Sequence, residues 1–239
     1  MRRRSESIRY ERDYSLIAFD IFPQGADADR VKEIINEVEQ HGADTRDTDG
    51  EERDKPTLLN TRYLGILAER VIAAHLRTTF GEGIRVFNRR FVRYDTHVDI
   101  EIKIGEKKTD LEVRSSFGYA PIQQLIEEHF DHLGPYVTPS KPGEKPKKFY
   151  LRGLINKSVD DFDYKKEHTF YFAGGASYRS IKEEGKIKKG RRMEEIDIEE
   201  AERLLASENQ TTLYRTLELW KGKDAVEIID LIKRAIGEV

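Results

Sequence analysis

Residues 97–116, HVDIEIKIGEKKTDLEVRSS, carry the pattern from which the fold is best predicted. Apolar and charged residues alternate before Gly105, and the alternation resumes after Lys108. A period of two is typical of β-strands, and a short polar segment that contains glycine is typical of a hairpin turn. The stretch therefore predicts two antiparallel strands, over 97–104 and 109–116.

The two faces of this predicted hairpin differ in chemistry, because successive side chains of a strand point to opposite faces. The aliphatic residues of both strands are expected on one face. Asp99 is expected on the other face, near Glu112 and Arg114, since all three lie far from the turn. Two carboxylates and a cation are thus predicted to converge. A plain solvent face is the alternative, in which each cross-strand charge pair contributes only about 0.2–1 kcal/mol.

Segments on both sides of the hairpin predict an α/β (α+β) fold with a central mixed β-sheet flanked by helices. An apolar stripe predicts the longest helix over 58–80. Other helices are predicted from Asp27 or Asp29 up to Gly42, over 121–133, near 198–206 and over 225–236. Other strands are predicted over 14–22, 84–94, 148–156 and 168–173, and near 213–220.

Two local features carry expectations of their own. Arg2 to Arg4 begin a charged segment that we expect to be unstructured. Gly174 and Gly175 are expected to turn the strand at 168–173 into a short helix, where free backbone N–H groups could receive a phosphate. A plain tight turn is the simpler interpretation of these glycines.

The composition narrows the class of protein. The chain has 239 residues and a formal net charge of −3, which argues against a uniformly basic surface but leaves room for a local basic cleft. Cysteine is absent, so any metal must be held by oxygen or histidine ligands, and thiol nucleophiles and disulfides are excluded. No stretch reaches the roughly 20 apolar residues of a membrane span, and the Arg-rich start lacks the apolar segment typical of a secretory signal. A cytoplasmic location without a membrane partner is expected.

Three short motifs occur in a particular order around the hairpin. They are Gly65-x-x-x-Glu69 in the predicted long helix, Val98-Asp99-Ile100 in the first hairpin strand, and Glu112-Val113-Arg114-Ser115-Ser116 in the second. Asp99 precedes Glu112 by thirteen positions, and a predicted helix follows. In this order the motifs resemble the core of the PD-(D/E)XK nuclease superfamily, which includes restriction endonucleases. The resemblance covers residues 58–133 and extends more weakly to 148–156.

This resemblance implies a restriction endonuclease-like core and a metal-dependent endonuclease that hydrolyses DNA, of the restriction or repair type. Asp99 and Glu112 would bind one or two Mg²⁺ ions, with Mn²⁺ as an alternative, and Glu69 would assist as an auxiliary ligand. Magnesium prefers oxygen ligands and keeps several waters, so a small carboxylate cluster is a sufficient site. RNA is not excluded as a substrate. A homodimer would bring two sites to the two strands of a duplex.

Arg114 departs from the superfamily pattern, in which lysine usually stands two residues after the strand glutamate. Arginine can hold a phosphate through two parallel hydrogen bonds, but it stays protonated and cannot act as a general base. Lys103, on the same face of the neighbouring strand, could supply an ammonium group instead. Val98 also departs, because proline usually precedes the aspartate. The alternatives to an active enzyme are a non-catalytic nucleic-acid-binding module on the same fold and an unrelated structural or interaction protein.

Further residues are candidates for contact with nucleic acid. The run KIKKGRR at 186–192 favours phosphate binding most strongly, because it is a dense basic run in an otherwise acidic protein. A solvated loop is the alternative for each group. The candidates are Lys103, Arg89, Arg90, Ser115, Ser177, Arg179, Lys186, Lys188, Lys189, Arg191 and Arg192. His129 and His132, three positions apart in the predicted helix at 121–133, are a weaker candidate for a metal site with Asp131.

The domain organisation follows from residues 43–55, ADTRDTDGEERDK, which contain no apolar residue larger than alanine. Such a segment is typical of a solvated linker. We therefore expect residues 1–56 to form an N-terminal strand–helix extension and acidic linker. Residues 57–239 are expected to form the nuclease-like domain with a C-terminal helical decoration.

Overall fold

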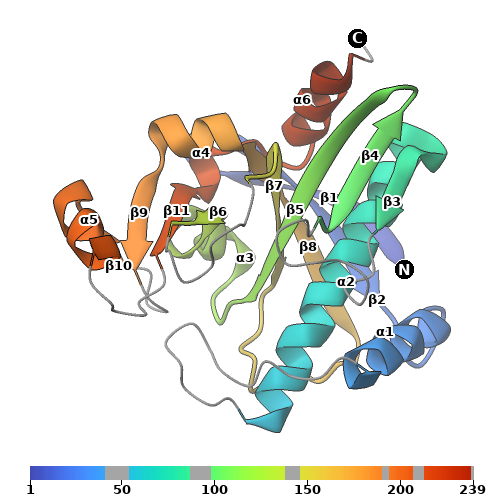
Figure 1. Cartoon of the computed structure of the whole chain (residues 1–239). Helices are drawn as coiled ribbons and strands as arrows, with labels where there is room; N and C mark the ends of the chain where they lie inside the picture. Colours follow the sequence, from blue (N-terminus) through green and yellow to red (C-terminus); the bar gives the residue numbers. More distant parts are fainter. Residues whose placement is uncertain (41–53, 87–97, 138–145, 190–193, 207–212, 238–239) are drawn as a thin grey trace.

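The chain forms two β-sheets with helices packed around them (Figure 1). The computed structural model describes residues 1–40, 54–86, 98–137, 146–189, 194–206 and 213–237. A seven-stranded mixed sheet has the order β1-β2-β8-β7-β5-β4-β3, and a four-stranded sheet has the order β10-β9-β11-β6. The predicted α/β architecture, a mixed sheet flanked by helices, is confirmed.

The element bounds locate the predicted segments. The larger sheet contains β1 (Arg2–Arg9), β2 (Asp13–Ile21), β3 (Ile84–Val86), β4 (Ile100–Ile104), β5 (Lys107–Phe117), β7 (Phe149–Ile155) and β8 (His168–Ser177). The smaller sheet contains β6 (Asp131–Tyr136), β9 (Lys186–Lys189), β10 (Glu194–Ile196) and β11 (Leu213–Glu218). The helices are α1 (Ala28–Gln40), α2 (Lys55–Phe80), α3 (Ile122–Gln124), α4 (Tyr178–Glu184), α5 (Ile198–Ala206) and α6 (Glu227–Ile236). Short helical turns are η1 (Gly81–Gly83), η4 (Leu125–His129) and η5 (Leu219–Lys221).

The pairing of the larger sheet is antiparallel except at one place. β3, β4 and β5 form an antiparallel meander, whereas β5 and β7 run parallel. Parallel neighbours need a crossover connection. Here the crossover contains α3, η4 and β6, so the second sheet begins within it. β7 then pairs antiparallel with β8.

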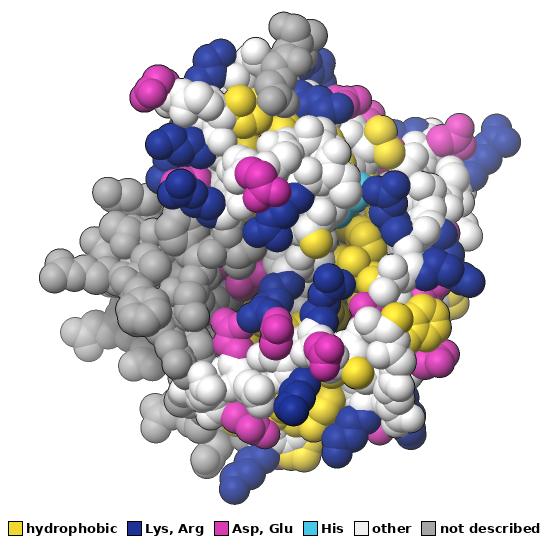
Figure 2. Space-filling model, turned by 90° about the vertical axis from the view of Figure 1, so that its right-hand side faces the viewer, with side chains coloured by type: hydrophobic (Ala, Val, Ile, Leu, Met, Phe, Trp, Pro, Cys, Tyr) yellow, Lys and Arg dark blue, Asp and Glu magenta, His cyan; other side chains and the backbone are white. Residues whose placement is uncertain are grey.

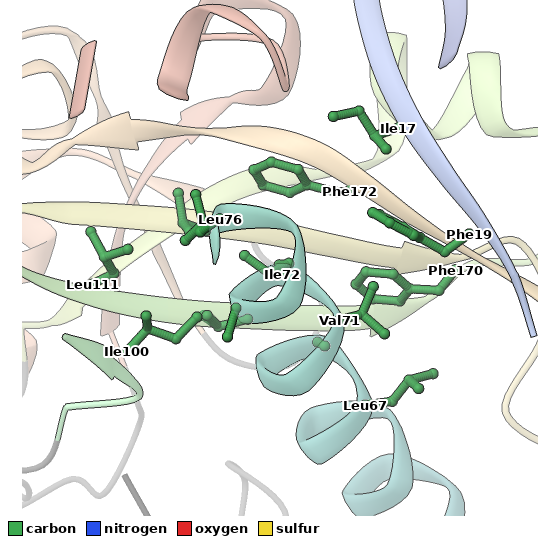
Figure 3. Close-up of a cluster of buried hydrophobic side chains, with 14 of the residues drawn as sticks. Ile17, Phe19, Leu67, Val71, Ile72, Leu76, Ile100, Leu111, Phe170 and Phe172 are labelled. Carbon is green, nitrogen blue, oxygen red and sulfur yellow. The ribbon is translucent and has the colours of Figure 1, made fainter. Parts of the chain in front are cut away.

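Helix α2 covers one face of the larger sheet and organises its core. The side chain of Asp54 accepts a hydrogen bond from the N–H of Thr57 (2.7 Å), and Gly81 ends the helix with φ 61°. The apolar stripe of α2 is buried against β4, β5 and β8, and each such side chain contributes about 1.5–3 kcal/mol. Figure 3 shows this contact, in which the labelled side chains are Ile17, Phe19, Leu67, Val71, Ile72, Leu76, Ile100, Leu111, Phe170 and Phe172. Within the described ranges, no helix combines the length and the apolar character that a bilayer crossing requires.

The N-terminal segment is part of the same sheet and core. The expectation of an unstructured arm at Arg2 to Arg4 is wrong, because β1 pairs along its whole length with β2. Arg2 and Arg4 form ion pairs with Asp20 of β2, at 3.2 and 3.3 Å, and these contacts hold the edge strand. β2 in turn pairs with β8, so the residues before the acidic segment close one side of the larger sheet.

The segment at 121–133 differs from its prediction. The apolar pattern predicts one helix, but the structure has the short α3 and η4, followed by the strand β6. Leu125 and Ile126 are buried as a helical stripe would be. From Asp131 onward, pairing with β11 replaces the helix, with Asp131 opposite Glu218. Tertiary pairing overrides local propensity here.

The short helix expected after this strand is present as α4, but Gly174 and Gly175 lie within β8 and do not form the turn into it, so that part of the expectation is wrong. Gly175 exchanges two backbone hydrogen bonds with Lys223, each 2.8 Å long. Gly174 has φ 104°, and a β-carbon there would overlap the carbonyl oxygen of Lys223. The glycines therefore allow the segment before α6 to approach β8 closely.

A stability measurement tests this explanation. Gly174→Ala is expected to lower the free energy of unfolding by about 2 kcal/mol or more, from unfavourable φ and steric overlap together. Gly65→Ala in α2 is the matched control, because a β-carbon added there would meet nothing within 4 Å. The control is expected to stabilise the helix by up to about 1 kcal/mol. Equal effects of the two substitutions in urea unfolding would contradict the account.

Candidate functional site

The β4–β5 hairpin positions the two strand carboxylates. Ile100 lies opposite Leu111 and Ile102 lies opposite Thr109. Extending this register by one residue places Asp99 opposite Glu112. Ile100 and Leu111 belong to the core beneath α2, as the alternation predicts. The hairpin therefore separates an apolar face from a face that carries the charged residues.

Asp99 lies where the β4 ladder ends. It is 1% exposed, and its Oδ2 accepts a hydrogen bond from the backbone N–H of Val113 at 2.7 Å. This contact fixes the carboxylate against β5, beside Glu112. A buried carboxylate requires such hydrogen bonds or a positive partner, because its transfer from water is costly.

Glu112 and Arg114 share a face of β5, two residues apart. The Oε1 of Glu112 lies 3.1 Å from the Nη2 nitrogen of Arg114, and the two side chains are 8% and 21% exposed. Glu101, on β4, is also buried and forms an ion pair with Lys108. The interpretation of this hairpin face as a plain solvent face is therefore wrong for Asp99, Glu101 and Glu112.

Glu69 is buried on α2 at 5% exposure. In the described part of the chain, however, no group of three or more acidic or histidine side chains is arranged to hold a metal ion. The structure thus brings Asp99 and Glu112 together without adding Glu69 as a third ligand. The same finding applies to the weaker candidate at His129, Asp131 and His132, whose residues lie on η4 and β6.

The predicted cations lie in different surroundings. Lys103 is exposed and lies opposite Lys108 near the hairpin turn. Four residues of strand separate it from Asp99, about 13 Å, so it cannot supply an ammonium group beside Glu112. Arg89, Arg90, Arg191 and Arg192 lie outside the described residues.

The basic run at 186–192 forms the strand β9 over its first four residues, and its lysines are bound by acids. The shortest ion pairs are Lys186 with Glu195 at 2.8 Å, Lys188 with Asp131 at 2.5 Å and Lys189 with Glu200 at 2.6 Å. Figure 2 shows one face of the molecule, on which Lys and Arg side chains are interspersed with Asp and Glu. Phosphate binding by β9 would have to compete with these acids.

Three other residues predicted to contact nucleic acid are Ser115, Ser177 and Arg179. Ser115 is half-buried on β5, opposite Gly153. Ser177 caps α4 by accepting a hydrogen bond from the N–H of Ser180 at 3.0 Å. Arg179 is 84% exposed and pairs with Glu183 at 3.0 Å. Ser177 and Arg179 therefore have partners that explain their presence without a ligand.

Arg152 is a residue of this site that the sequence analysis missed. It lies on β7 opposite Arg114 of β5 and is 1% exposed. Its Nη2 nitrogen donates to the Oγ of Ser116 at 2.9 Å, and the guanidinium lies 5.2 Å from the ring centre of Phe130. Burial lowers the pKa of Arg152 to about 10, so it stays charged at neutral pH. An arginine inside FYLRGLI, whose other residues are all apolar or glycine, is the signal that could have identified it.

Two strands of the second sheet bring further polar groups to this region. Asp131 of β6 forms its ion pair with Lys188 of β9, and a cavity of about 10 Å³ beside the pair has room for a single water molecule. His132 is 1% exposed. Burial, and then the positive charge of Arg152, lower the pKa of His132 to about 3, so the ring is neutral at neutral pH.

Comparison with known proteins gives one distant similarity. The chain is similar to the uncharacterized protein MJECS01 of Methanocaldococcus jannaschii, with 22% identity over 255 aligned positions that cover 88% of this chain and 84% of that protein. No model of a known protein family matches the chain, and no solved structure matches it. Because the relative is itself uncharacterized, the similarity assigns no activity to this chain.

Proposed function

We propose that the chain is a metal-dependent nuclease that hydrolyses phosphodiester bonds of DNA at a site built on Asp99 and Glu112. The observation that carries the proposal is the burial of both carboxylates, at 1% and 6% exposure, where Asp99 accepts a hydrogen bond from the N–H of Val113, the residue after Glu112. Arg114 already compensates part of this negative charge, through its ion pair with Glu112. A divalent cation would stabilise two buried carboxylates close to each other further.

The order of the elements around these carboxylates supports the proposal. Helix α2 precedes the antiparallel meander of β3, β4 and β5, and the crossover that begins with α3 leads to β7, which is parallel to β5. This is the order of helix and strand segments on which the resemblance to the PD-(D/E)XK nucleases rests. A restriction endonuclease-like core therefore remains our proposal for the part of the fold from α2 to β7.

Two carboxylates are a sufficient set of protein ligands for Mg²⁺. Magnesium is commonly held by one or two carboxylates, with waters and substrate phosphates in its remaining positions. Asp99 and Glu112 satisfy that need without a third protein ligand, so the proposal gives Glu69 no primary role. A bound ion would lower the pKa of a water molecule and neutralise charge that develops on the phosphate. Mn²⁺ suits the same oxygen ligands.

Arg114 contributes positioning in this proposal. Its guanidinium lies beside Glu112 and can donate two parallel hydrogen bonds to phosphate oxygens. It cannot take a proton from water, because arginine stays protonated in proteins. Activation of water is therefore assigned to the metal ion alone.

The proposal predicts cleavage that depends on a divalent metal. Purified protein is expected to cut duplex DNA in Mg²⁺ or Mn²⁺ and to leave it intact in EDTA or Ca²⁺. Calorimetry without DNA is expected to show Mg²⁺ binding that Glu112→Gln weakens, because this substitution removes a charged ligand. Equal cutting of DNA in EDTA and in Mg²⁺ would contradict a metal-dependent site. Labelled RNA in a parallel reaction distinguishes the two substrate classes.

A second function is favoured by one specific observation. Arg114 stands where the superfamily usually has lysine, and it is ion-paired with Glu112. A site changed in this way can bind a phosphate without cleaving it. DNA binding without cleavage in any metal would support a non-catalytic nucleic-acid-binding module, and neither binding nor cleavage would support a structural protein. Sedimentation measurements would test the homodimer that double-strand cutting suggests.

A further inference from the structure

Two arginines lie side by side on the sheet face that α2 does not cover. In the parallel register of β5 and β7, Arg114 is opposite Arg152, and opposite residues project to the same face. Their neighbours show which face this is, because Leu151 of β7 packs in the core beneath α2, whereas Tyr150 and Leu154 pack in clusters on the other side. Two positive charges on neighbouring strands repel each other unless an anion lies between or beside them.

Arg152 has donors that the described residues do not use. A guanidinium carries five N–H donors, and a buried one normally finds acceptors for them. The Nη2 nitrogen of Arg152 bonds to Ser116, but its Nε and Nη1 atoms are buried with no hydrogen-bond acceptor among the residues that the structure describes. Contact with the ring of Phe130 compensates this cation only in part.

The nearby carboxylates have other cationic partners. Glu112 is bound by Arg114, and Asp131 is bound by Lys188. Asp99, held beside Glu112, is a third carboxylate, so three cations meet three carboxylates among the described side chains of this cluster, and His132 is neutral. The formal charges balance, but the Nε and Nη1 donors of Arg152 still lack acceptors among the described residues. A tetrahedral oxyanion offers the missing acceptors.

We propose that Arg114 and Arg152 form a paired guanidinium site for a phosphate group. Arg114, with 21% of its side chain exposed, forms the entrance, and Arg152 forms the buried floor. The hydroxyl of Ser116 accepts from Arg152 and has a proton of its own to donate to the same oxyanion. The inference deepens the proposed function and rests on it for the choice of a nucleic-acid phosphodiester as the ligand; free phosphate shares the chemistry.

The test is Arg152→Met, which removes the guanidinium but keeps an unbranched side chain of suitable length for the core. Binding is measured in EDTA, by anisotropy of a labelled DNA duplex and by the rise in Tm that inorganic phosphate produces. The variant is expected to bind the duplex at least tenfold more weakly, to lose the phosphate-dependent rise, and to keep or raise its own Tm, because a buried cation has been removed. Arg30→Met, at an exposed arginine of α1, is the matched control and is expected to bind as wild type.

Each other outcome has a definite meaning. Unchanged binding of both probes, with a lowered Tm, would show that Arg152 is structural and would overturn the proposal. If the variant loses the phosphate-dependent rise in Tm but binds the duplex as wild type does, the guanidinium site exists and its ligand is free phosphate. If the methionine variant does not fold, Arg152→Lys replaces it in the test, because lysine retains the charge. This variant is expected to fold and to bind both probes several-fold more weakly than wild type. Wild-type binding by Arg152→Lys would also overturn the proposed pairing of Arg114 with Arg152. The binding measurements contain EDTA and therefore no free metal ion. If separate assays show no cleavage, that result contradicts the proposed function but leaves the guanidinium site intact.

Discussion

Replacing Asp99 by asparagine is expected to reduce metal-dependent cleavage of DNA by about a thousandfold or more, because it removes a charged ligand from the proposed site. The fold is expected to survive. The amide oxygen of asparagine can still accept the hydrogen bond from the N–H of Val113, which Asp99 now accepts at 2.7 Å. Loss of activity would then reflect charge and metal binding, and not unfolding. Initial rates of plasmid nicking and the Tm of both proteins measure the two effects.

Two further substitutions sharpen this experiment. Asp110→Asn changes the same chemical group on β5, where Asp110 pairs with the exposed Lys108 at 3.5 Å, and is expected to leave cleavage within about twofold. Asp99→Ala is expected to cost an additional 1–3 kcal/mol, roughly, because the N–H of Val113 loses its acceptor. Wild-type cleavage by Asp99→Asn would remove Asp99 from the site and would leave the purpose of its burial unexplained.

Acid is expected to destabilise the protein through its buried histidines. His75 of α2 is 8% exposed and packs against Phe19 and Phe172, and burial lowers its pKa to about 4. Burial lowers the pKa of His132 to about 3. Both values lie below the 6.5 of an unfolded histidine, so the unfolded state binds more protons in this range. Their contribution to stability is therefore complete above pH 6.5 and is lost as pH falls toward 4 and 3.

The expected size is large enough to measure. Between pH 7.5 and pH 5, each histidine is expected to lower the free energy of unfolding by at most about 2 kcal/mol. Urea unfolding at the two pH values measures the change, and stopping at pH 5 avoids the titration of most carboxylates. Burial also lowers the pKa of His168, so His132→Gln and His75→Gln should each remove part of the pH dependence. His129→Gln, at an exposed residue of η4, is the control, and a variant of either buried histidine that keeps the full pH dependence would refute the assignment.

Prediction of the fold succeeded where the signal is local. The alternation in residues 97–116 predicts the hairpin, and the register of β4 with β5 confirms it. The apolar stripe that predicts a helix over 58–80 corresponds to α2. Prediction failed at β1 and β6, because their own residues do not alternate clearly. Each is a strand through its pairing, β1 with the adjacent β2 and β6 with the distant β11. Gly174 was misinterpreted for a related reason, since its contact lies on Lys223.

For the candidate site too, local features could be predicted from the sequence and long-range ones could not. Which residues share a strand face follows from a period of two along the chain, so the nearness of Glu112 to Arg114 could be predicted from their spacing. Burial could not, because the segments that cover the charged face come from elsewhere; Phe130, from the connection between β5 and β7, lies over Arg152. The pairing of Arg114 with Arg152 depends on the register of two strands separated by that connection. Local periodicity contains no information about such a register, which long-range packing sets.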